Sequence, residues 1–498
     1  MTIFERPGMG ADAPDQLELD AVLHAAAMTV GADRVTGRLA AGAEPAPRPN
    51  VGMYRGRRVY ARIRPRTPDQ VARVVEVFAQ HRAPCGVHAV STGHNWGLGS
   101  HEPALDNAVT LELDDLDRVR ALDTRAGWAV VEPGVTQGSL AGLLAGTERM
   151  LNATAASAHT SVIGNALDRG VGLRRQRVDD IAGLEVVLPD GEMVRVGWWP
   201  DGEGRDTAVY PHGVGPCPLP MFFQSNLGVV TAAVVRLLPR PEAQCVVRLS
   251  FGRPVLPAAI DVLRRWTAQG FVHGVLKVYD DVSTEFYGGL VGEFLAHVCV
   301  SGTAEYVDAV VDVLVSEAVR AGIFSAVVRS DEESASDVVA TMAESAYAGD
   351  PSGNDAMLMA TLGQSADHVD ERGPGWLFFL PLVPFSGGAV ARAHALLTTI
   401  QERTGIRAGS TVNALGPDLI DFVVSIKFDR AREVDPAHRA LDLAHELFTA
   451  AGFLPYRLDI DHADWVDRLG TDPNARRFTR RLKNLIDPHG SIAPGRYA

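Results

Sequence analysis

The sequence of 498 residues is poor in cysteine, in long apolar runs and in positive charge. Its four cysteines, Cys85, Cys217, Cys245 and Cys299, form no CxxC pair, so a disulfide scaffold, a zinc cluster and thioredoxin-type chemistry are not expected. No stretch reaches about 18 uncharged apolar residues, which predicts that no segment spans a membrane. The first 16 residues carry acidic side chains and no apolar run, unlike a secretory signal. These absences predict a soluble, cytoplasmic protein.

The charge balance is acidic, with 47 Lys and Arg against 61 Asp and Glu and a net charge of −14. A chain of this charge is a poor general binder of nucleic acid or of an anionic membrane, and neither is expected as a partner. An anionic ligand would instead need local hydrogen-bond donors. The content of 46% apolar and 22% charged residues is that of a globular protein, and the length favours two domains.

The most regular pattern begins with a predicted strand at Val59–Ile63. An apolar face with helical spacing follows, formed by Val71, Val74, Val75 and Phe78. Cys85–Val90 is the next predicted strand, so residues 59–90 form a β-α-β unit. This unit leads directly into the segment STGHNWGLGS, residues 91–100.

Further along, Leu184–Leu188 and Met193–Val196 flank a Pro-Asp-Gly turn and predict a hairpin. Val229–Leu238 predicts a long strand, and the prolines at 239 and 241 mark the clearest domain boundary. Residues 242–440 alternate strands and helices without comparable glycine loops, which indicates a sheet covered by helices. The predicted fold class is α+β.

The segment 91–100 has three glycines in ten residues directly after a β-α-β unit. Backbone N–H groups that are free of side-chain bulk can wrap a pyrophosphate, which suits an acidic chain. The segment is neither a Walker loop nor GxGxxG, and an ordinary tight turn is the alternative interpretation.

Five further segments follow in a fixed order. They are VEPGV (131–135), SVIGNALDRGVG (161–172), GLEVVLPDGE (183–192), FFQSNLGVVT (222–231) and RLKNLIDPHGSIAPGRY (481–497). Together with segment 91–100 they resemble the FAD-linked oxidases of the vanillyl-alcohol oxidase and p-cresol methylhydroxylase family. The resemblance runs from about Val59 to Pro241, fades, and returns near Leu454–Tyr497.

The resemblance implies a p-cresol-methylhydroxylase-type FAD-binding domain of two α+β subdomains and a cap domain with a large antiparallel sheet. We place an N-terminal segment at 1–50, the FAD-binding domain at 51–241, the cap or substrate domain at 242–453, and a return to the FAD-binding domain at 454–498. The resemblance also implies which residues would contact FAD. They are Ser91, Thr92, Gly93, His94, Asn95, Trp96, Gly97, Gly134, Val135, Gly164, Asn165, Glu185, Val186 and Arg496. A salt bridge at a helix end is the other interpretation of Arg496. No metal site is predicted.

His94 belongs to a Gly-His pair that resembles the one in berberine-bridge-type and sugar oxidases, where this histidine bonds to the 8α-methyl of the flavin. A neutral imidazole is a suitable nucleophile for that carbon. The alternative is a histidine that only hydrogen-bonds the phosphate. The cap-domain linkage of the phenol oxidases would fall near Ile420 and Asp421, where neither His nor Tyr occurs, and residues 151–172 contain no Cys for a second linkage.

On the substrate side, Tyr456 and Arg457 match a Tyr-Arg pair that steadies the phenolate oxygen in the phenol oxidases. Leu98 replaces a Tyr expected in the first loop, and the arginines of residues 173–177 replace a Tyr-rich stretch. Simple para-alkylphenols are therefore in doubt. The arginines either meet an anionic or oxygen-rich substrate or decorate a surface.

His159 falls by rough register near flavin N5, where a neutral histidine could act as a base, and a structural loop histidine is the alternative. We therefore predict an FAD-dependent oxidoreductase that moves a hydride from an alcohol, phenol or amine substrate to flavin N5 and passes electrons to dioxygen. A dehydrogenase that uses a cytochrome or quinone and a redox-silent flavin carrier are the alternatives. The arginine-rich, lysine-poor composition suggests bacterial specialised metabolism, and a homodimer is expected by analogy alone.

Overall fold

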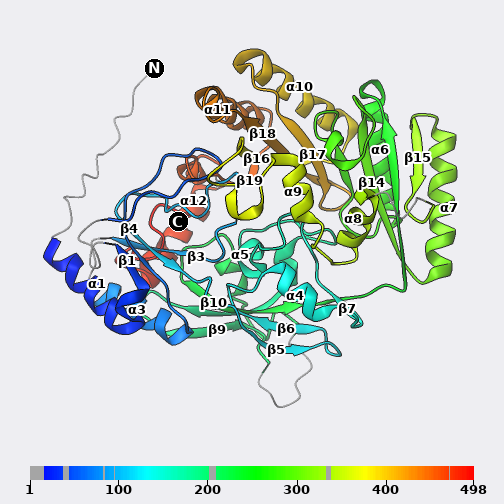
Figure 1. Ribbon diagram of the computed structural model, residues 1–498. Coiled ribbons are helices and arrows are strands. Elements are labelled where there is room, and N and C mark those ends of the chain that lie inside the picture. Colours follow the sequence, from blue (N-terminus) through cyan, green and yellow to red (C-terminus); the bar gives the residue numbers. More distant parts are fainter. Residues whose placement is uncertain are drawn as a thin grey trace.

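The computed structural model describes residues 16–37, 44–81, 85–94, 96–200, 209–332, 338–469 and 472–497. Within these ranges the strands form a four-stranded, a five-stranded, a two-stranded and an eight-stranded sheet. Figure 1 shows the smaller sheets on one side of the molecule and the large sheet with its helices on the other. This arrangement confirms the predicted α+β class. No helix among the described residues is both long and apolar enough to pass through a bilayer.

The four-stranded sheet contains the predicted β-α-β unit. Its strands, in spatial order, are β1 (Val35–Gly37), β2 (Val59–Ile63), β4 (Ala108–Glu112) and β3 (Gly86–Val90). Its helices are α1 (Gln16–Val30) and α3 (Pro68–Gln80). Thr67 caps α3 by accepting from the Gln70 N–H, and the predicted face of α3 is buried. Strand β4 lies between β2 and β3 and is parallel to both, so the segment after β3 begins at the carboxyl end of parallel strands.

The second sheet carries the predicted hairpin. Its strands are β5 (Val119–Asp123), β6 (Trp128–Val131), β10 (Val229–Arg236), β8 (Ile181–Val187) and β9 (Met193–Gly197). A small pair consists of β11 (Leu238–Pro239) and β7 (Arg149–Met150). Helices α4 (Gln137–Leu144) and α5 (Val162–Leu167) pack their apolar side chains into the core of this sheet.

The large sheet is antiparallel throughout. Its strands, in order, are β15 (Ala326–Arg329), β12 (Ala243–Phe251), β14 (Phe294–Gly302), β13 (Lys277–Tyr279), β17 (Gly409–Ala414), β18 (Leu419–Phe428), β16 (Gly375–Pro384) and β19 (Pro455–Arg457). The helices of this part are α6 (Leu256–Ala268), α7 (Ala304–Ala321), α8 (Val338–Tyr347), α9 (Asn354–Leu362), α10 (Gly387–Thr404) and α11 (Val434–Ala450). Alternate side chains of the strands, such as Phe379, Phe422 and Val424, pack with helix residues into one core. The opposite face is therefore left for a cavity.

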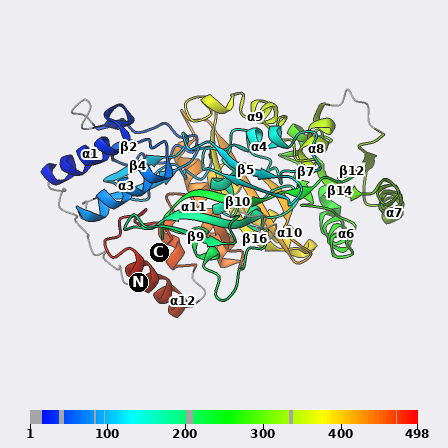
Figure 2. The same ribbon diagram turned by 90° about the horizontal axis from the view of Figure 1, so that it is seen from below.

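The strand pairing bears on two of the predicted domain limits. Strand β1 pairs with β2 and helix α1 packs against α3, so the described part of segment 1–50 belongs to the first sheet. Residues 455–457 form β19 at the edge of the large sheet, and only afterwards does the chain return. Helix α12 (Pro473–Ile486) then precedes Ile492, which bridges to Val87 of β3. Figure 2 shows α12 on the side of the molecule where α3 lies.

Candidate functional site

Two cavities meet at the glycine-rich segment that follows β3. The first is a cleft lined by segment 91–94, by the start of α5 and by the chain end near Arg496. The second, of about 750 Å³, lies between that segment and the large sheet. His94, Ala156 and Asn165 line both cavities, so a ligand in the cleft can reach the second cavity here.

The backbone of the segment explains its glycines. Gly93 and Gly97 have φ values of +75° and +48°, in the left-handed region that glycine tolerates best. A Cβ on Gly97 would lie 2.2 Å from the Phe378 ring, so the segment can approach β16 only without a side chain there. The Tyr54 hydroxyl donates to the Gly97 carbonyl at 2.8 Å and fixes this conformation.

The cleft fits a polar, phosphate-bearing ligand. Three of its lining residues have a buried polar atom without a partner in the described part of the chain, namely Thr160 Oγ1, Asn165 Oδ1 and Arg496 Nε. Buried polar atoms of this kind normally have hydrogen-bond partners. A Cβ on Gly164 would come within 2.5 Å of Ser91 Oγ, so the backbone of α5 lies close against the segment. A dinucleotide in the cleft would supply the missing partners.

The structure brings seven of the predicted FAD-contacting residues together on the cleft, which are Ser91, Thr92, Gly93, His94, Gly164, Asn165 and Arg496. Arg496 donates to the carbonyls of Ser100 and Glu102 and forms no salt bridge at a helix end among the described residues. Asn95 lies outside the described residues. Trp96 lines the second cavity instead of the cleft.

The other predicted FAD contacts, Gly134, Val135, Glu185 and Val186, do not line the cleft. Glu185 is buried and paired with Arg120 at 2.8 Å and Arg195 at 3.0 Å, away from the cleft lining. Burial raises the pKa of Glu185, but its arginine partners lower it below the ordinary value overall. Val135 and Val186 pack into the core of the second sheet. Gly134 allows a close backbone approach, because its Cβ would lie 2.1 Å from the Asp114 carbonyl oxygen.

The second cavity is formed by one face of the large sheet. Because side chains alternate along a strand, residues two apart share this face. They include Gly409, Thr411 and Asn413 of β17, and Asp421, Val423, Ser425 and Lys427 of β18. Leu98 lines the cavity at the opposite side, and Trp376, Phe378 and Leu380 of β16 supply an apolar wall.

Tyr456 and Arg457 lie at the cavity as predicted. Arg457 is buried, and its Nε donates to Asp168 Oδ2 at 3.1 Å, while its Nη2 forms an ion pair with the same oxygen. The Tyr497 hydroxyl donates to the other Asp168 oxygen at 3.1 Å. Burial works against the charge of Arg457, but Asp168 holds its pKa above the ordinary value. The guanidinium is therefore a fixed cation.

Tyr456 is connected to a buried carboxyl group. Its hydroxyl donates to Asp421 Oδ2 at 3.4 Å, and Gln224 Nε2 donates to its carbonyl at 2.9 Å. Burial raises the pKa of Tyr456 well above the ordinary value, so the phenol stays protonated and can donate. Burial also raises the pKa of Asp421, to about 6. The sequence does not single out Asp168, Gln224 or Tyr497, although all three lie within quoted segments, and it considers Asp421 only as the position of a flavin linkage.

His94 is positioned as a neutral imidazole. Its ring lies edge-on to Trp96 with centroids 5.2 Å apart. Burial, and after it the nearby His159, lower the pKa of His94. A neutral ring at the junction of the two cavities is the form that nucleophilic attack requires.

His159 lies outside the lining of both cavities. Its side chain is exposed. Its ring centroid is 6.3 Å from that of His94, and its backbone N–H donates to Ser157 Oγ. The position of His159 thus gives its predicted role as a base no support, and that role stays a prediction.

The arginines of residues 173–177 are neither substrate ligands nor surface decoration. Arg177 is buried, with its Nε 3.2 Å from Asp180, and it donates to the Asn152 carbonyl at 2.7 Å. Arg175 pairs with the same Asp180 at 2.7 Å. Arg174 donates to the Tyr347 carbonyl at 2.9 Å and to other groups of the cap. Arg174 therefore joins this region to the cap, whereas the partners of Arg175 and Arg177 lie within the FAD-binding part.

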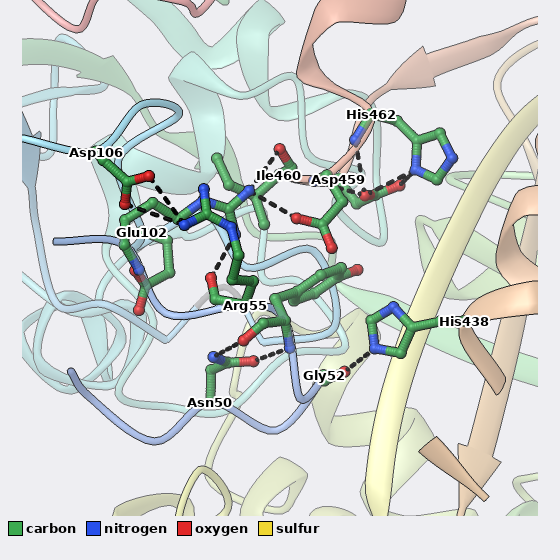
Figure 3. A network of polar contacts seen from close by, with 12 residues as sticks. Asn50, Gly52, Arg55, Glu102, Asp106, His438, Asp459, Ile460 and His462 are labelled. Carbon is green, nitrogen blue, oxygen red and sulfur yellow. Dashed lines mark hydrogen bonds and ion pairs between the residues drawn. The ribbon is translucent and has the colours of Figure 1, made fainter. Parts of the chain in front are cut away.

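A polar network next to the site holds the glycine segment against the cap (Figure 3). Arg57 pairs with Asp461 at 2.6 Å, and His438 of α11 contacts the Gly52 carbonyl at 2.8 Å. Asp459 accepts from His462 at 2.9 Å and from His445 at 2.9 Å. Because Tyr54 of the same region bonds Gly97, this network couples the site loop to the returning chain.

Comparisons with known proteins agree with this geometry. Residues 60–197 match the model of a family described as an FAD binding domain. The chain is 27% identical to 1'-carboxy-chondrochloren decarboxylase of Chondromyces crocatus, over 88% of this chain and 90% of that protein. It is 25% identical to the flavoprotein subunit of 4-cresol dehydrogenase (hydroxylating) of Pseudomonas putida, over 86% of each. The isoeugenol complex of 4-ethylphenol oxidase from Gulosibacter chungangensis has the same fold, with a TM-score of 0.84 at 22% identity over 97% of this chain and 98% of that one.

Proposed function

We propose that this chain, an FAD-linked oxidoreductase with the fold of p-cresol methylhydroxylase, removes a hydride from a C–H bond of a phenolic small molecule held in the second cavity. The observation that carries the proposal is the pair of half-buried Tyr456 and buried Arg457 in the wall of a cavity that opens onto the cofactor cleft. Two donors, one of them a fixed cation, suit an oxygen that carries negative charge.

FAD bound in the cleft supplies a two-electron acceptor for the departing hydride. Ser91, Thr92, Gly93, Gly164, Asn165 and Arg496 are the residues that would hold it. The apolar wall formed by Trp376, Phe378 and Leu380 would pack against an aromatic ring and exclude water from the reacting carbon.

The substrate hydroxyl can lose its proton along groups that the structure provides. Tyr456 can accept that proton as its own proton moves to Asp421, with which it shares a hydrogen bond. Arg457 stays charged and stabilises the oxyanion that remains, because Asp168 and Tyr497 hold the guanidinium in place. An oxyanion para to the reacting carbon donates electron density and favours loss of the hydride.

The test is to mix the FAD-loaded enzyme with 4-propylphenol and related phenols without oxygen. Reduction of the flavin is monitored as the loss of its absorbance. We expect reduction by the wild type and, for Tyr456→Phe, reduction slower by about 10²-fold or more, since the proton relay is lost. Val423→Ala, another cavity residue without a polar group, is the matched control. If dithionite reduces the flavin but no phenol does, the proposal is wrong.

We further propose that FAD is attached covalently through His94, because the ring is neutral and lies where the cleft meets the second cavity. Acid precipitation of the purified protein should leave yellow colour in the pellet. His94→Ala should release all colour to the supernatant, whereas His159→Ala, its exposed neighbour, should keep it in the pellet. Colour that stays with the His94→Ala pellet would place the bond elsewhere.

For reoxidation we propose dioxygen, with a cytochrome or quinone as the alternative, since one relative is named as a dehydrogenase subunit. Turnover with dioxygen as the sole acceptor separates the two. Another relative is named as a decarboxylase, so the product mixture should also be assayed for released carbon dioxide.

A further inference from the structure

A row of polar side chains crosses the cavity face of the large sheet. In the strand register Lys277 of β13 lies opposite Asn413 of β17, and Asn413 lies opposite Asp421 of β18. Lys277 Nζ donates to Asn413 Oδ1 at 2.7 Å, and Asn413 Nδ2 donates to Asp421 Oδ2 at 3.1 Å. All three line the second cavity. The row therefore begins at an ammonium and leads toward Tyr456.

Lys277 has capacity for a ligand. It is 8% exposed, and within the described ranges the bond to Asn413 is the one hydrogen bond that its ammonium makes. Its Nζ also lies 5.9 Å from the centroid of the Tyr279 ring. An ammonium has three donors, so two remain for a group in the cavity.

No carboxylate of the described residues forms an ion pair with Lys277 within 4 Å, because Asn413 separates it from Asp421. A buried charge without a direct counter-ion is unfavourable. Burial accordingly lowers the pKa of Lys277, to about 8, while Asp421 opposes this shift. An anion in the cavity would restore the counter-ion.

Lysine is rare in this chain, and Lys277 differs from the other lysines in its surroundings. The sequence contains three lysines, at 277, 427 and 483, and uses arginine elsewhere. Lys483 is buried in hydrogen bonds to Asn226, Asp487 and Ile492. Lys427 lies over the Phe286 ring at 3.8 Å and contacts the Thr361 carbonyl. Both are thus engaged with protein groups, whereas Lys277 lines the cavity and makes one hydrogen bond among the described residues.

We propose that Lys277, held by Asn413, binds a carboxylate at the end of the substrate remote from the phenolic oxygen. The inference rests on the proposed function and narrows its substrate class to phenols whose para side chain ends in a carboxylate. Two strand spacings separate Lys277 from Asp421, which is roughly 10 Å between backbones. An aryl ring with a side chain of a few carbons spans that separation. Arg457 would hold the oxygen and Lys277 the acid.

The experiment compares three probes in the FAD-loaded enzyme, namely 3-(4-hydroxyphenyl)propanoate, its amide and 4-propylphenol. Dissociation constants come from perturbation of the flavin spectrum and from the concentration dependence of anaerobic reduction. We expect the wild type to bind the carboxylate about 10-fold or more tightly than the amide, since a charge-assisted hydrogen bond is being compared with a neutral one.

Lys277→Met should weaken carboxylate binding by about 10–100-fold and leave 4-propylphenol within about 3-fold. Lys277→Gln keeps a donor of similar length and serves if the methionine variant fails to fold. Lys427→Met is the matched control for a second cavity lysine. The deciding quantity is the ratio of the dissociation constants of the amide and the carboxylate. A wild-type ratio near one overturns the inference. So does a ratio that stays at the wild-type value in both Lys277 variants, or one that falls to about one in Lys427→Met. If dithionite reduces the flavin but none of the three probes does, the proposed function fails instead.

Discussion

The ion pair between Arg457 and Asp168 connects the returning chain to the cofactor-binding part, and its removal tests how much that connection stabilises the protein. Arg457 lies on β19 of the large sheet, and Asp168 is the C-cap residue of α5 in the other part of the molecule. Their side chains are 8% and 19% exposed. Replacing Arg457 by Met keeps the apolar stem and removes the cation, so Asp168 loses its main counter-charge.

Removal of one partner of a buried ion pair costs about 3–5 kcal/mol, and the partial exposure of Asp168 places the value near the lower limit, at about 3 kcal/mol. With a urea m value of about 3 kcal/mol per M, the unfolding midpoint of Arg457→Met should fall by about 1 M. Asp168→Asn should be destabilising too, because it leaves the guanidinium unpaired. The double variant should be more stable than the sum of the two losses predicts, by about 1–3 kcal/mol.

Urea unfolding of all four proteins, followed by tryptophan fluorescence at constant FAD saturation, measures this coupling. Arg55→Met, which removes an exposed partner of Asp106, is the control and should cost no more than about 1 kcal/mol. Strictly additive losses for Arg457 and Asp168 would refute the claim that the pair links the two parts.

Two further predictions concern the cleft and the network of Figure 3. Gly164→Val should abolish FAD binding, because a Cβ at this position would already lie 2.5 Å from Ser91 Oγ. The ratio of absorbance at 450 nm and 280 nm of the purified protein measures the bound FAD. Gly142→Val is the control and should retain FAD, because there is open space around Gly142. His462 has its pKa raised to about 9, since Asp442 and Asp459 outweigh the opposing effect of burial. Its folded-state pKa exceeds the unfolded value of about 6.5, so its contribution to stability is complete below pH 6.5 and is lost as the pH rises through 9. Thermal unfolding between pH 6 and 10 should therefore show a decline that His462→Gln removes, and an equal decline in that variant would contradict the assignment.

Local patterns were sufficient to predict the elements around the cofactor cleft. Strand β2 ends where the sequence placed it, and the apolar spacing in α3 and the turn between β8 and β9 are explained by local chemistry. The glycine segment was also accessible, because positive φ at Gly93 and Gly97 is a property of single residues. Such features depend on neighbours within a few positions.

The substrate side could not be predicted in the same way. Lys277, Asn413 and Asp421 come from three strands, and only the register of the large sheet places them in one row. The sequence alone suggests a surface or substrate role for Arg177, because its buried partner Asp180 and the carbonyl of Asn152 become its neighbours only after folding. Distance along the chain from the second glycine segment is what places His159 near flavin N5, and that distance carries no information on which way the loop faces.

The route of residues 455–497 has a consequence for maturation. This stretch first completes the edge of the large sheet with Arg457 and then crosses to place Ile492 beside β3 and Tyr497 on the cleft. During synthesis the other strands of all the sheets emerge before it. A nascent chain would thus fold most of its core with an open, incomplete pocket. Cofactor capture would wait until this stretch docks, so an enzyme competent to reduce flavin would arise in one late step rather than gradually.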